Sequence, residues 1–243
     1  MSGIKLKPKP KQLIVVFTDG SCSRNGRKGA IGGIGVHFPN GELADVSKIY
    51  SRGPCTNQKT ELYAILTALR YINQNLSLEK YNVLIKTDSN YSINCVTTWI
   101  NGWIRNGWVN SKGDPVANRE FIEPIHKYVG LYDIEFEHVS AHTNSDDPDS
   151  LGNDMADTLA TRATQRAIAE VAKAASAKAL NRTNTGTRSG SKTRGTANTR
   201  GRGQGQARGS ARGRAPAKRG GSNARTRTRA APDPDDIEVE LIG

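Results

Sequence analysis

Two aspartates stand where a soluble fold would bring them together at one edge of a sheet. Asp19 and Asp88 each follow a β-prone apolar run, at 13–17 and 83–86. Because adjacent strands of one sheet end side by side, the two carboxylates are expected to meet. Clustered carboxylates repel one another unless they bind cations, and oxygen ligands suit Mg²⁺ or Mn²⁺. Such a cluster is typical of a two-metal site for phosphoryl transfer, with metals about 3.5–4 Å apart.

Two further acidic residues, Glu61 and Asp157, lie within predicted helices. Glu61 immediately precedes Leu62, where the apolar face of its helix restarts, and Asp157 lies among apolar helix residues near Leu159. Each of the four carboxylates taken alone has an ordinary explanation as a turn residue, an N-cap or a helix charge. Two strand-end aspartates in one sheet are harder to explain in that way, so we interpret the four as one site.

The hydrophobic pattern predicts the elements that must position these residues. Strands are expected at 13–17, 31–38, 43–50, 83–86 and 132–139. Helices are expected from 57 with Thr56 as N-cap, from Asp88-Ser89 to about 100, at 118–129 and at 151–180. Three meander strands followed by strands alternating with helices predict an α/β fold. Its mixed five-stranded sheet, an antiparallel meander plus parallel strands, would be flanked by helices.

Composition divides the chain into a globular front and a basic tail. Residues 1–161 hold 17 basic and 17 acidic residues, whereas 162–230 hold 18 basic residues and one acidic residue. Residues 181–230 contain no aromatic residue and no Leu, Ile, Val or Met, so they cannot bury enough apolar surface to fold. The segments expected are a flexible basic lead (1–11), a catalytic domain (12–164), a helical extension (165–180), a disordered Arg/Gly-rich tail (181–230) and an acidic C-terminal segment (231–243).

Cysteine usage and apolar run lengths exclude several classes of protein. Three cysteines without a CxxC pair argue against a disulfide scaffold or a structural zinc site. A reducing intracellular compartment, nucleus or cytoplasm, is therefore expected. The longest early apolar run, 13–17, is too short for a signal peptide or a membrane span. We expect no membrane association and no secretion.

Four sequence blocks carry a resemblance to a known family. They are TDGSCSRNG (18–26), TNQKTELYAILTAL (56–69), KTDSNYSINCVTTWINGWIRNGW (86–108) and HVSAH…GNDMADTLA (138–160). In order and spacing they resemble the type 1 ribonucleases H, more closely the cellular eukaryotic enzymes than the bacterial or retroviral ones. The resemblance covers residues 12 to about 164. It implies an endoribonuclease that hydrolyses the RNA strand of RNA:DNA hybrids and leaves 5′-phosphate and 3′-hydroxyl ends.

The resemblance assigns the catalytic residues. The family's four metal-binding carboxylates fall here on Asp19, Glu61, Asp88 and Asp157. They would hold two Mg²⁺ ions, with Mn²⁺ as a substitute, one activating water and the other stabilising the leaving 3′-oxygen. His142 aligns with the family's mobile-loop histidine, whose role is proton transfer or product release.

Substrate contacts are implied in the same way. The 2′-hydroxyl distinguishes RNA from DNA, and the family's minor-groove contacts fall on Cys22, Arg24, Asn25, Asn57, Gln58 and Asn90. For Asn57 and Gln58, solvation of a helix N-terminus is the alternative.

The DNA strand has its own expected contacts. Aromatic residues of the family's DNA channel fall on Tyr91, Trp99 and Trp103, whose spacing lets one helical face present them. A hydrophobic core stripe is the alternative for these three. Thr56 and Asn118 match a phosphate pocket; the family's third member, an arginine, is Pro54 here, and Arg52 is the candidate replacement.

The tail departs from the family pattern. Cellular eukaryotic relatives usually carry a small N-terminal hybrid-binding domain, which eleven residues cannot form. We hypothesise that the Arg/Gly tail supplies sequence-independent phosphate binding instead. A solubilising or localising tail is the alternative. The acidic segment could dock on a partner or shield the basic tail.

Three competing functions stay open at the sequence level. The chain could be an RNase H domain of a retroelement polyprotein, against which stand an initiating Met and a self-contained tail. It could be a catalytically weak RNA- or hybrid-binding protein that acts through its tail, although all four carboxylates are present. An integrase-like or resolvase-like protein is disfavoured by the Asn57-Gln58 pair and the Trp-bearing helix. A monomeric nuclease is the expected form.

Overall fold

The computed structural model describes residues 11–141 and 145–186, with side chains to residue 180. Two units divide the chain, and the elements below belong to the one that contains residues up to Lys178, apart from the end of the last helix. The strands are β1 (Gln12–Ser23), β2 (Ile31–His37), β3 (Val46–Ile49), β4 (Tyr81–Thr87) and β5 (Ile134–His138). The α-helices are α1 (Asn57–Asn75), α2 (Asn90–Asn94), α3 (Ile100–Arg105), α4 (Arg119–Leu131) and α5 (Pro148–Gly186).

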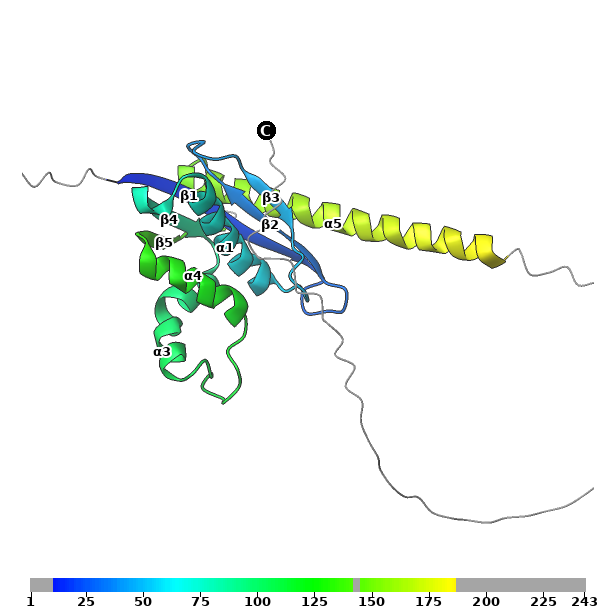
Figure 1. Ribbon diagram of the computed structural model, residues 1–243. Coiled ribbons are helices and arrows are strands. Elements are labelled where there is room, and N and C mark those ends of the chain that lie inside the picture. Colours follow the sequence, from blue (N-terminus) through cyan, green and yellow to red (C-terminus); the bar gives the residue numbers. More distant parts are fainter. Residues whose placement is uncertain (1–10, 142–144, 187–243) are drawn as a thin grey trace, which may run out of the picture. The chain divides into compact units, whose positions relative to one another are not determined.

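The five strands form one mixed sheet in the order β3-β2-β1-β4-β5 (Figure 1). β1, β2 and β3 pair antiparallel, whereas β1 pairs parallel with β4 and β4 pairs parallel with β5. This arrangement confirms the predicted mixed sheet of a meander plus parallel strands. The carboxyl ends of β1, β4 and β5 consequently gather at one edge, where α/β proteins place their ligands.

β1 is longer than predicted, and the expectation that it ends at Phe17 is wrong. It pairs with β4 only from Gln12 to Phe17, and then continues to Ser23 because it pairs with β2 from Phe17 onward. Asp19 therefore lies inside a strand rather than after one. It stands two residues beyond the last β1 residue that pairs with β4, and Asp88 follows the end of β4.

Helices cover both faces of the sheet (Figure 1). α1 begins where predicted, because the Thr56 side chain caps it by accepting a hydrogen bond from the Lys59 amide. Its apolar stripe is fully buried against the sheet and α4, and includes Leu62, Ile65, Leu69 and Ile72. α5 packs on the opposite face, where the Ser47 hydroxyl of β3 donates to the Leu159 carbonyl at 2.7 Å.

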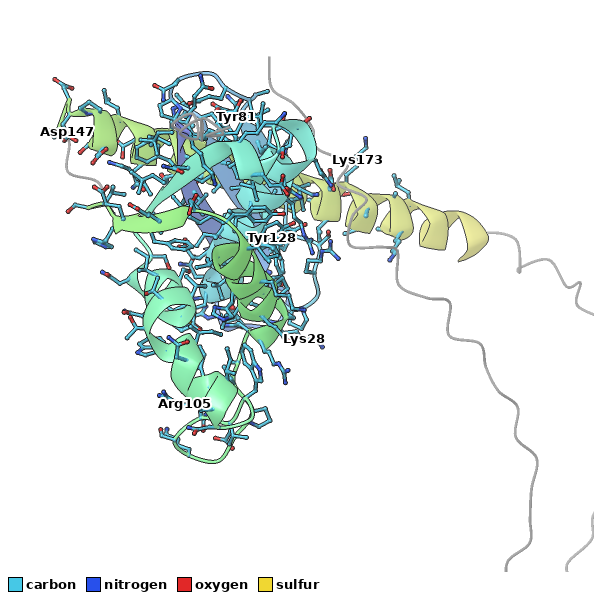
Figure 2. All side chains as sticks on the ribbon, turned by 60° about the vertical axis from the view of Figure 1, so that its left-hand side comes forward. Lys28, Tyr81, Arg105, Tyr128, Asp147 and Lys173 are labelled. Carbon is cyan, nitrogen blue, oxygen red and sulfur yellow. The ribbon has the colours of Figure 1, made fainter. Side chains whose placement is uncertain are left out.

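Several other predicted boundaries differ from the structure. The helix expected to end near Ile100 is continuous to Arg105 but has three segments. These are α2, a π-helical turn (Cys95–Trp99) and α3. α3 lies away from the sheet, with Arg105 at its far end (Figure 2). The strand predicted at 43–50 is only Val46–Ile49. α4 retains its helical form around Pro124.

α5 is longer than predicted at both ends. It starts at Pro148 rather than Leu151, because Asp147 accepts hydrogen bonds from the Asp149 and Ser150 amides and from the Ser150 hydroxyl. Figure 2 places Asp147 at this end of the helix. The helix continues to Gly186, beyond the predicted end near Leu180 and into the segment expected to be disordered. The remaining tail, the acidic segment and the first ten residues lie outside the described residues.

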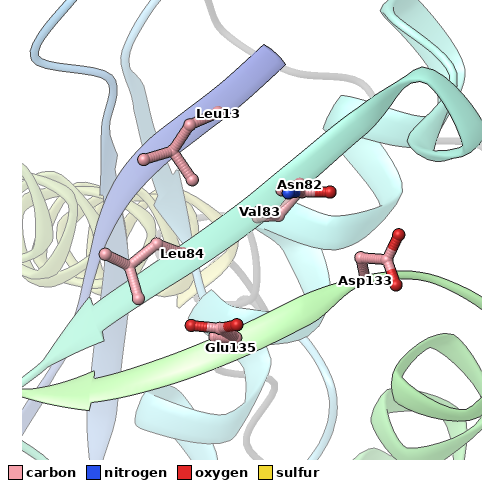
Figure 3. Close-up of a pocket in the computed structure, with 6 residues that line it drawn as sticks. All are labelled: Leu13, Asn82, Val83, Leu84, Asp133 and Glu135. Carbon is pink, nitrogen blue, oxygen red and sulfur yellow. The ribbon is translucent and has the colours of Figure 1, made fainter. Parts of the chain in front are cut away.

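Among the described residues, none of the helices combines the length and apolarity needed to cross a bilayer. A hollow on the sheet is lined by Leu13, Asn82, Val83, Leu84, Asp133 and Glu135 (Figure 3). It lies at the amino ends of β1, β4 and β5, whereas the predicted carboxylates lie toward the other end of these strands.

Candidate active site

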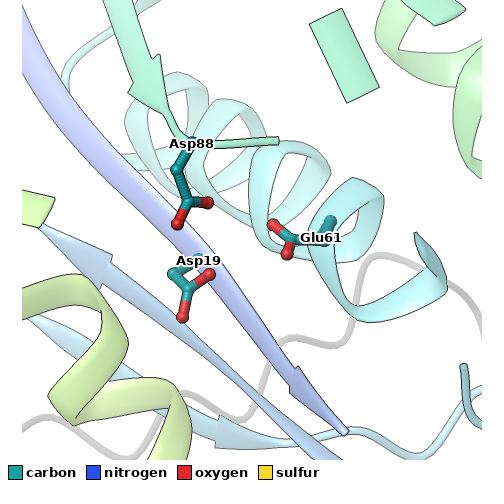
Figure 4. Close-up of side chains that lie close together, drawn as sticks. All are labelled: Asp19, Glu61 and Asp88. Carbon is teal, nitrogen blue, oxygen red and sulfur yellow. The ribbon is translucent and has the colours of Figure 1, made fainter. Parts of the chain in front are cut away.

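Three of the four predicted carboxylates meet in space. One oxygen each from Asp19 of β1, Glu61 of α1 and Asp88, the residue after β4, lie within 4.8 Å of one another (Figure 4). Asp19 and Glu61 are each 6% exposed, and Asp88 is half-buried. The cluster joins residues far apart in the chain, because strand pairing and helix packing converge at this edge of the sheet.

A glycine permits this close approach of helix and strand. A Cβ atom at Gly20 would lie 2.2 Å from the backbone nitrogen of Glu61, so any side chain there would push α1 away from β1. The Gly20 backbone also hydrogen-bonds to the carboxylates of Asp19 and Glu61. Gly20 thus brings the two carboxylates together and partly stabilises their charge.

Asp157 lies beside this cluster rather than within it. It is half-buried on α5, hydrogen-bonds with Asp19 and accepts a hydrogen bond from the Thr161 hydroxyl at 3.4 Å. It is not one of the three residues whose oxygens all lie within 4.8 Å of one another. The fourth predicted carboxylate therefore reaches the site through Asp19.

Glycines of β2 bring α5 close enough for this contact. A Cβ at Gly35 would lie 2.0 Å from the Ala156 carbonyl oxygen, and one at Gly33 would lie 2.4 Å from the Ala163 side chain. The helix therefore rests directly on the β2 backbone. Lys86 of β4 fixes its start by donating to both Asp149 oxygens at 2.6 and 2.7 Å.

The cluster is electrostatically unfavourable without a cation. Burial, followed by repulsion from Asp88, raises the pKa of Asp19 from 3.8 to about 7. Burial and repulsion from Asp19 also raise the pKa of Glu61 well above its ordinary value. The Glu61 Oε2 atom is buried and has no hydrogen-bond partner among the described residues. An all-oxygen donor set with an orphaned, buried carboxylate oxygen fits a hard divalent cation.

The predicted RNA-strand contacts lie next to the carboxylates. The Asn57 amide group donates to Glu61 Oε1 at 3.3 Å, and the Asn57 backbone N–H donates to Asn25 Oδ1 at 3.1 Å. Gln58 and Arg24 are exposed beside them, and Arg24 adopts a left-handed backbone conformation with φ 58°. Asn90 begins α2 directly after the Asp88 turn. These residues form a polar rim around the carboxylates.

Cys22 differs from the other predicted contacts. Its sulfur lies 3.1 Å from Cys55 Sγ, and both residues are free thiols. Burial, followed by the hydrogen bond to Cys22, raises the pKa of Cys55 to about 12, so this thiol remains protonated. The Cys22 sulfur therefore faces the interior, and its backbone is the part available to a ligand.

The predicted aromatic residues form a continuous row. Ring centroids lie 6.0 Å apart for Tyr91–Trp99 and 5.8 Å apart for Trp99–Trp103. Trp99 is 41% exposed, whereas Tyr91 and Trp103 pack partly against the core. The row thus fits both alternatives considered from the sequence. Tyr91 and Trp103 pack partly against the core, and Trp99 is exposed to solvent, where it could contact DNA.

The predicted phosphate pocket is only partly assembled. Asn118 is buried and donates to the Tyr91 hydroxyl at 2.9 Å, and Thr56 uses its side chain to cap α1. The Arg52 guanidinium lies over the Tyr63 ring, 5.7 Å from its centroid. No contact joins Arg52 to Asn118 or Thr56 among the described residues.

Two histidines complete the description of this edge. His142 lies outside the described residues. His138, the last residue of β5, was missed from the sequence, although its ring lies 2.9 Å from the Asn90 amide nitrogen and 3.2 Å from the Asp88 carbonyl oxygen. The strand-end argument that selected Asp19 and Asp88 would have found it, had it been extended from acidic residues to histidine.

Comparison with known sequences supports one family. A family model described as RNase H matches residues 11–165. The chain is 54% identical over 143 residues to a probable ribonuclease H of Acanthamoeba polyphaga mimivirus, covering 59% of this chain and 62% of that one. It is 36% identical over 149 residues to ribonuclease H1 of Homo sapiens, covering 61% of this chain and 49% of that one. The chain thus spans about half to three-fifths of the length of these relatives.

Solved structures agree with this comparison. LC9-RNase H1, a type 1 RNase H with the type 2 active-site motif, aligns with a TM-score of 0.53 and 26% identity over 66% of this chain and 76% of that one. The foamy viral protease-reverse transcriptase in complex with an RNA/DNA hybrid aligns with a TM-score of 0.51 and 26% identity, over 68% of this chain and 22% of that one. The mixed sheet, the carboxylates at its edge and these matches all agree, and the chain belongs to the type 1 RNase H family.

Proposed function

We propose that this protein is an endoribonuclease that hydrolyses the RNA strand of RNA:DNA hybrids. The observation that carries the proposal is the buried cluster of Asp19, Glu61 and Asp88, bordered by the exposed amides of Asn57 and Asn90. Family membership and the ribonuclease H names of its relatives support the same activity.

The carboxylates would hold two divalent ions, Mg²⁺ with Mn²⁺ as a substitute. Asp19, Glu61, Asp88 and Asp157 would hold these ions, since the first three meet at one place and Asp157 interacts with Asp19. When bound, such ions activate a water molecule for attack on phosphorus and stabilise the leaving 3′-oxygen, which gives 5′-phosphate and 3′-hydroxyl ends. The Glu61 Oε2 atom, which has no hydrogen-bond partner among the described residues, would be one of the oxygens that hold a cation. His142 would transfer a proton or assist product release.

The polar rim would read the RNA strand through its 2′-hydroxyls. Amides can both donate to and accept from a hydroxyl group, which suits the side chains of Asn25, Asn57, Gln58 and Asn90. Arg24 and the Cys22 backbone would add contacts in the minor groove. The Asn57–Glu61 hydrogen bond connects this 2′-hydroxyl contact to the carboxylates, since it joins two side chains one turn apart on α1.

The aromatic row would receive the DNA strand. Trp99 is the exposed member, so its ring is available to pack against deoxyribose or a base, while Tyr91 and Trp103 hold it in place. Tyr91 also connects this row to Asn118, which with Thr56 would bind a DNA phosphate. Arg52 would add its charge nearby.

The Arg/Gly-rich tail would add phosphate binding of its own. With this tail, the nuclease would act as a monomer on nucleic acid in a reducing compartment. The strong basic excess of residues 162–230 supports phosphate binding by the tail, and the free thiols of Cys22 and Cys55 support a reducing compartment.

The experiment is cleavage of a labelled RNA:DNA hybrid with Mg²⁺ by the full chain and by Asp88→Asn. Hybrid cleavage should fall at least about a hundredfold in the variant, because one charged cation ligand is removed. Double-stranded and single-stranded RNA should remain intact. Hybrid binding without cleavage by the unaltered chain would contradict the proposal and leave a binding protein.

A matched control is Asp114→Asn. Asp114 is an exposed aspartate in the loop after α3, far in sequence from the carboxylates, and its substitution should leave the rate unchanged. Thermal unfolding of Asp88→Asn at or above the temperature of Asp114→Asn would show that the drop in cleavage reflects the missing ligand rather than a damaged structure.

A further inference from the structure

The carboxyl end of β5 carries a residue that the proposed mechanism does not use. β1, β4 and β5 are parallel, so their carboxyl ends lie at one edge of the sheet. The first two strands bring Asp19 and Asp88 to that edge, and the third brings His138. Residues at the carboxyl ends of parallel strands are those that face a ligand in α/β sheets.

The sheet itself fixes the position of His138. His138 pairs in register with Thr87, the residue before Asp88, and the following amide, that of Val139, donates to the Thr87 carbonyl at 3.1 Å. Its Nε2 atom lies 2.9 Å from Asn90 Nδ2 and 3.2 Å from the Asp88 carbonyl oxygen. The imidazole therefore bridges the end of β5 and the start of α2.

The shorter of these contacts orients the Asn90 side chain. A neutral imidazole that carries its proton on Nδ1 has an acceptor lone pair on Nε2, and the Asn90 amide N–H group can donate to it at 2.9 Å. The Asp88 carbonyl oxygen can only accept, so its 3.2 Å approach to Nε2 is not a hydrogen bond in this tautomer. The amide oxygen of Asn90 then has no hydrogen-bond partner among the described residues. Asn90 and His138 are both exposed, so that oxygen can meet a ligand that lies over the carboxylates.

A free amide oxygen is the group that a ribose 2′-hydroxyl needs as an acceptor. Deoxyribose has no hydroxyl at this position, so the contact distinguishes an RNA strand from a DNA strand. If the Asn90 side chain rotated freely, either its N–H₂ group or its oxygen could face the sugar, and an ordering entropy would oppose binding.

We propose that His138 is a positioning residue that holds the Asn90 amide with its oxygen toward the ribose 2′-hydroxyl of the RNA strand. This inference rests on the proposed function and deepens it. It assigns to His138 a part in choosing RNA over DNA, through Asn90, and no direct part in the hydrolysis.

The test measures kcat and KM on an RNA:DNA hybrid, and the Kd of this hybrid and of a DNA duplex of the same sequence in Mg²⁺-free buffer. His138→Ala should raise KM and the hybrid Kd about three- to tenfold, the range for removal of one neutral hydrogen bond. The kcat value and the Kd for the DNA duplex should stay within about twofold, since neither depends on the 2′-hydroxyl contact.

Two further variants make the result specific. Asn90→Ala should give the same increase in hybrid Kd, and the double variant should be no weaker than Asn90→Ala, because both act through one contact. His138→Gln keeps an acceptor and should restore most of the affinity. Glu135→Ala, an exposed change on the same strand, should alter nothing.

Three results would overturn the proposal. The first is a double variant whose increase in hybrid Kd is the product of the two single increases. The others are an equal increase in the Kd of the DNA duplex, or a decrease in kcat with KM unchanged. A wild-type chain that binds the hybrid without cleaving it would defeat the proposed function instead. In that case the binding measurements would still decide the role of His138.

Discussion

Asp19 and Glu61 are almost fully buried, yet neither forms an ion pair with a basic side chain among the described residues. Each is partly stabilised by the Gly20 backbone, and Glu61 also by Asn57. Burial penalises the charged form of both more strongly, followed by repulsion from Asp88 at Asp19 and from Asp19 at Glu61. The folded chain therefore favours protonation or cation binding at this place.

This balance predicts how stability depends on pH without divalent cations. The pKa of Asp19 is raised from 3.8 to about 7, so the folded state keeps a proton that the unfolded chain releases. Its contribution to stability is complete below pH 3.8, declines as pH rises, and is lost above about pH 7. At about 1.4 kcal/mol per pKa unit, the loss is at most about 4 kcal/mol.

Asp19→Asn removes this titration. In chemical denaturation with a chelator present, the variant should gain stability over the unaltered chain between pH 4 and pH 8. Adding Mg²⁺ should stabilise the unaltered chain more at pH 8 than at pH 6, because cation binding requires the ionised carboxylate. An Asp19→Asn effect that is the same at both ends of the pH range would show that Asp19 titrates normally.

The residues at this site were predictable to different degrees. The strand-end argument brought Asp19 and Asp88 together without any knowledge of the fold, and the structure confirms that meeting. The same argument, extended to histidine, also places His138 at this edge, because it lies at the end of β5, which pairs with β4. The direction of the Cys22 sulfur could not be judged from spacing alone, since it depends on Cys55, which is 33 residues away.

The position of α5 depends on glycines that let it pack closely against the sheet. Gly33 and Gly35 let it rest on the β2 backbone, and Gly152 lets it pack on the Phe17 ring, 2.4 Å from where a Cβ would stand. Asp157 reaches Asp19 only because of this close packing. The spacing of helix and sheet thus determines the geometry of the site.

Gly35→Ala tests this dependence. Its Cβ would lie 2.0 Å from the Ala156 carbonyl oxygen, so α5 must shift and carry Asp157 with it. We expect a stability loss of about 1–3 kcal/mol in urea denaturation. Hybrid cleavage should fall by about tenfold or more at a temperature where the variant is still folded.

Gly130→Ala is the matched control. Gly130 lies in α4 with open space around its Cα, and the alanine should stabilise the helix by about 0.5–1 kcal/mol. Unchanged cleavage is expected there. If Gly35→Ala were equally harmless, the close packing of α5 would not control the site.

The ends of several strands and helices could not be predicted from the local sequence. Periodicity located all five strands and α1, because burial on one face leaves a strong pattern. It could not give the end of β1, since residues 18–23 are held by pairing with β2. The π-helical turn Cys95–Trp99 has no distinct sequence signal, and the helix continues through it to Arg105.

For the whole molecule, the charge distribution determines the expected affinity for nucleic acid and its dependence on salt. The front of the chain is neutral overall, so long-range attraction to a duplex must come from the basic segment after it. Removing residues 181–243 should weaken hybrid binding about tenfold or more at low salt. The slope of log K against log salt should become shallower by about 0.7–0.9 for each phosphate that the shortened chain no longer neutralises.

A second truncation serves as the control. Removing only residues 231–243 deletes five acidic residues and leaves every arginine, so hybrid affinity should not decrease. Binding is measured by titration over a range of salt concentrations. An unaltered slope after removal of 181–243 would rule out a phosphate-binding role for the tail.

The exposure of α5 changes sharply along its length. Ala167 is its last buried residue, and every described side chain from Ile168 to Leu180 is exposed. Beyond Ala167 the helix is maintained by its own hydrogen bonds and its alanines, and a helix of about 12–15 residues is marginal in water on its own. Helix–coil fluctuations between Ile168 and Leu180 therefore expose no side chain that the described part of the structure buries. Unwinding can therefore proceed inward as far as Ala167 and leave Asp157, ten residues earlier, in place beside Asp19.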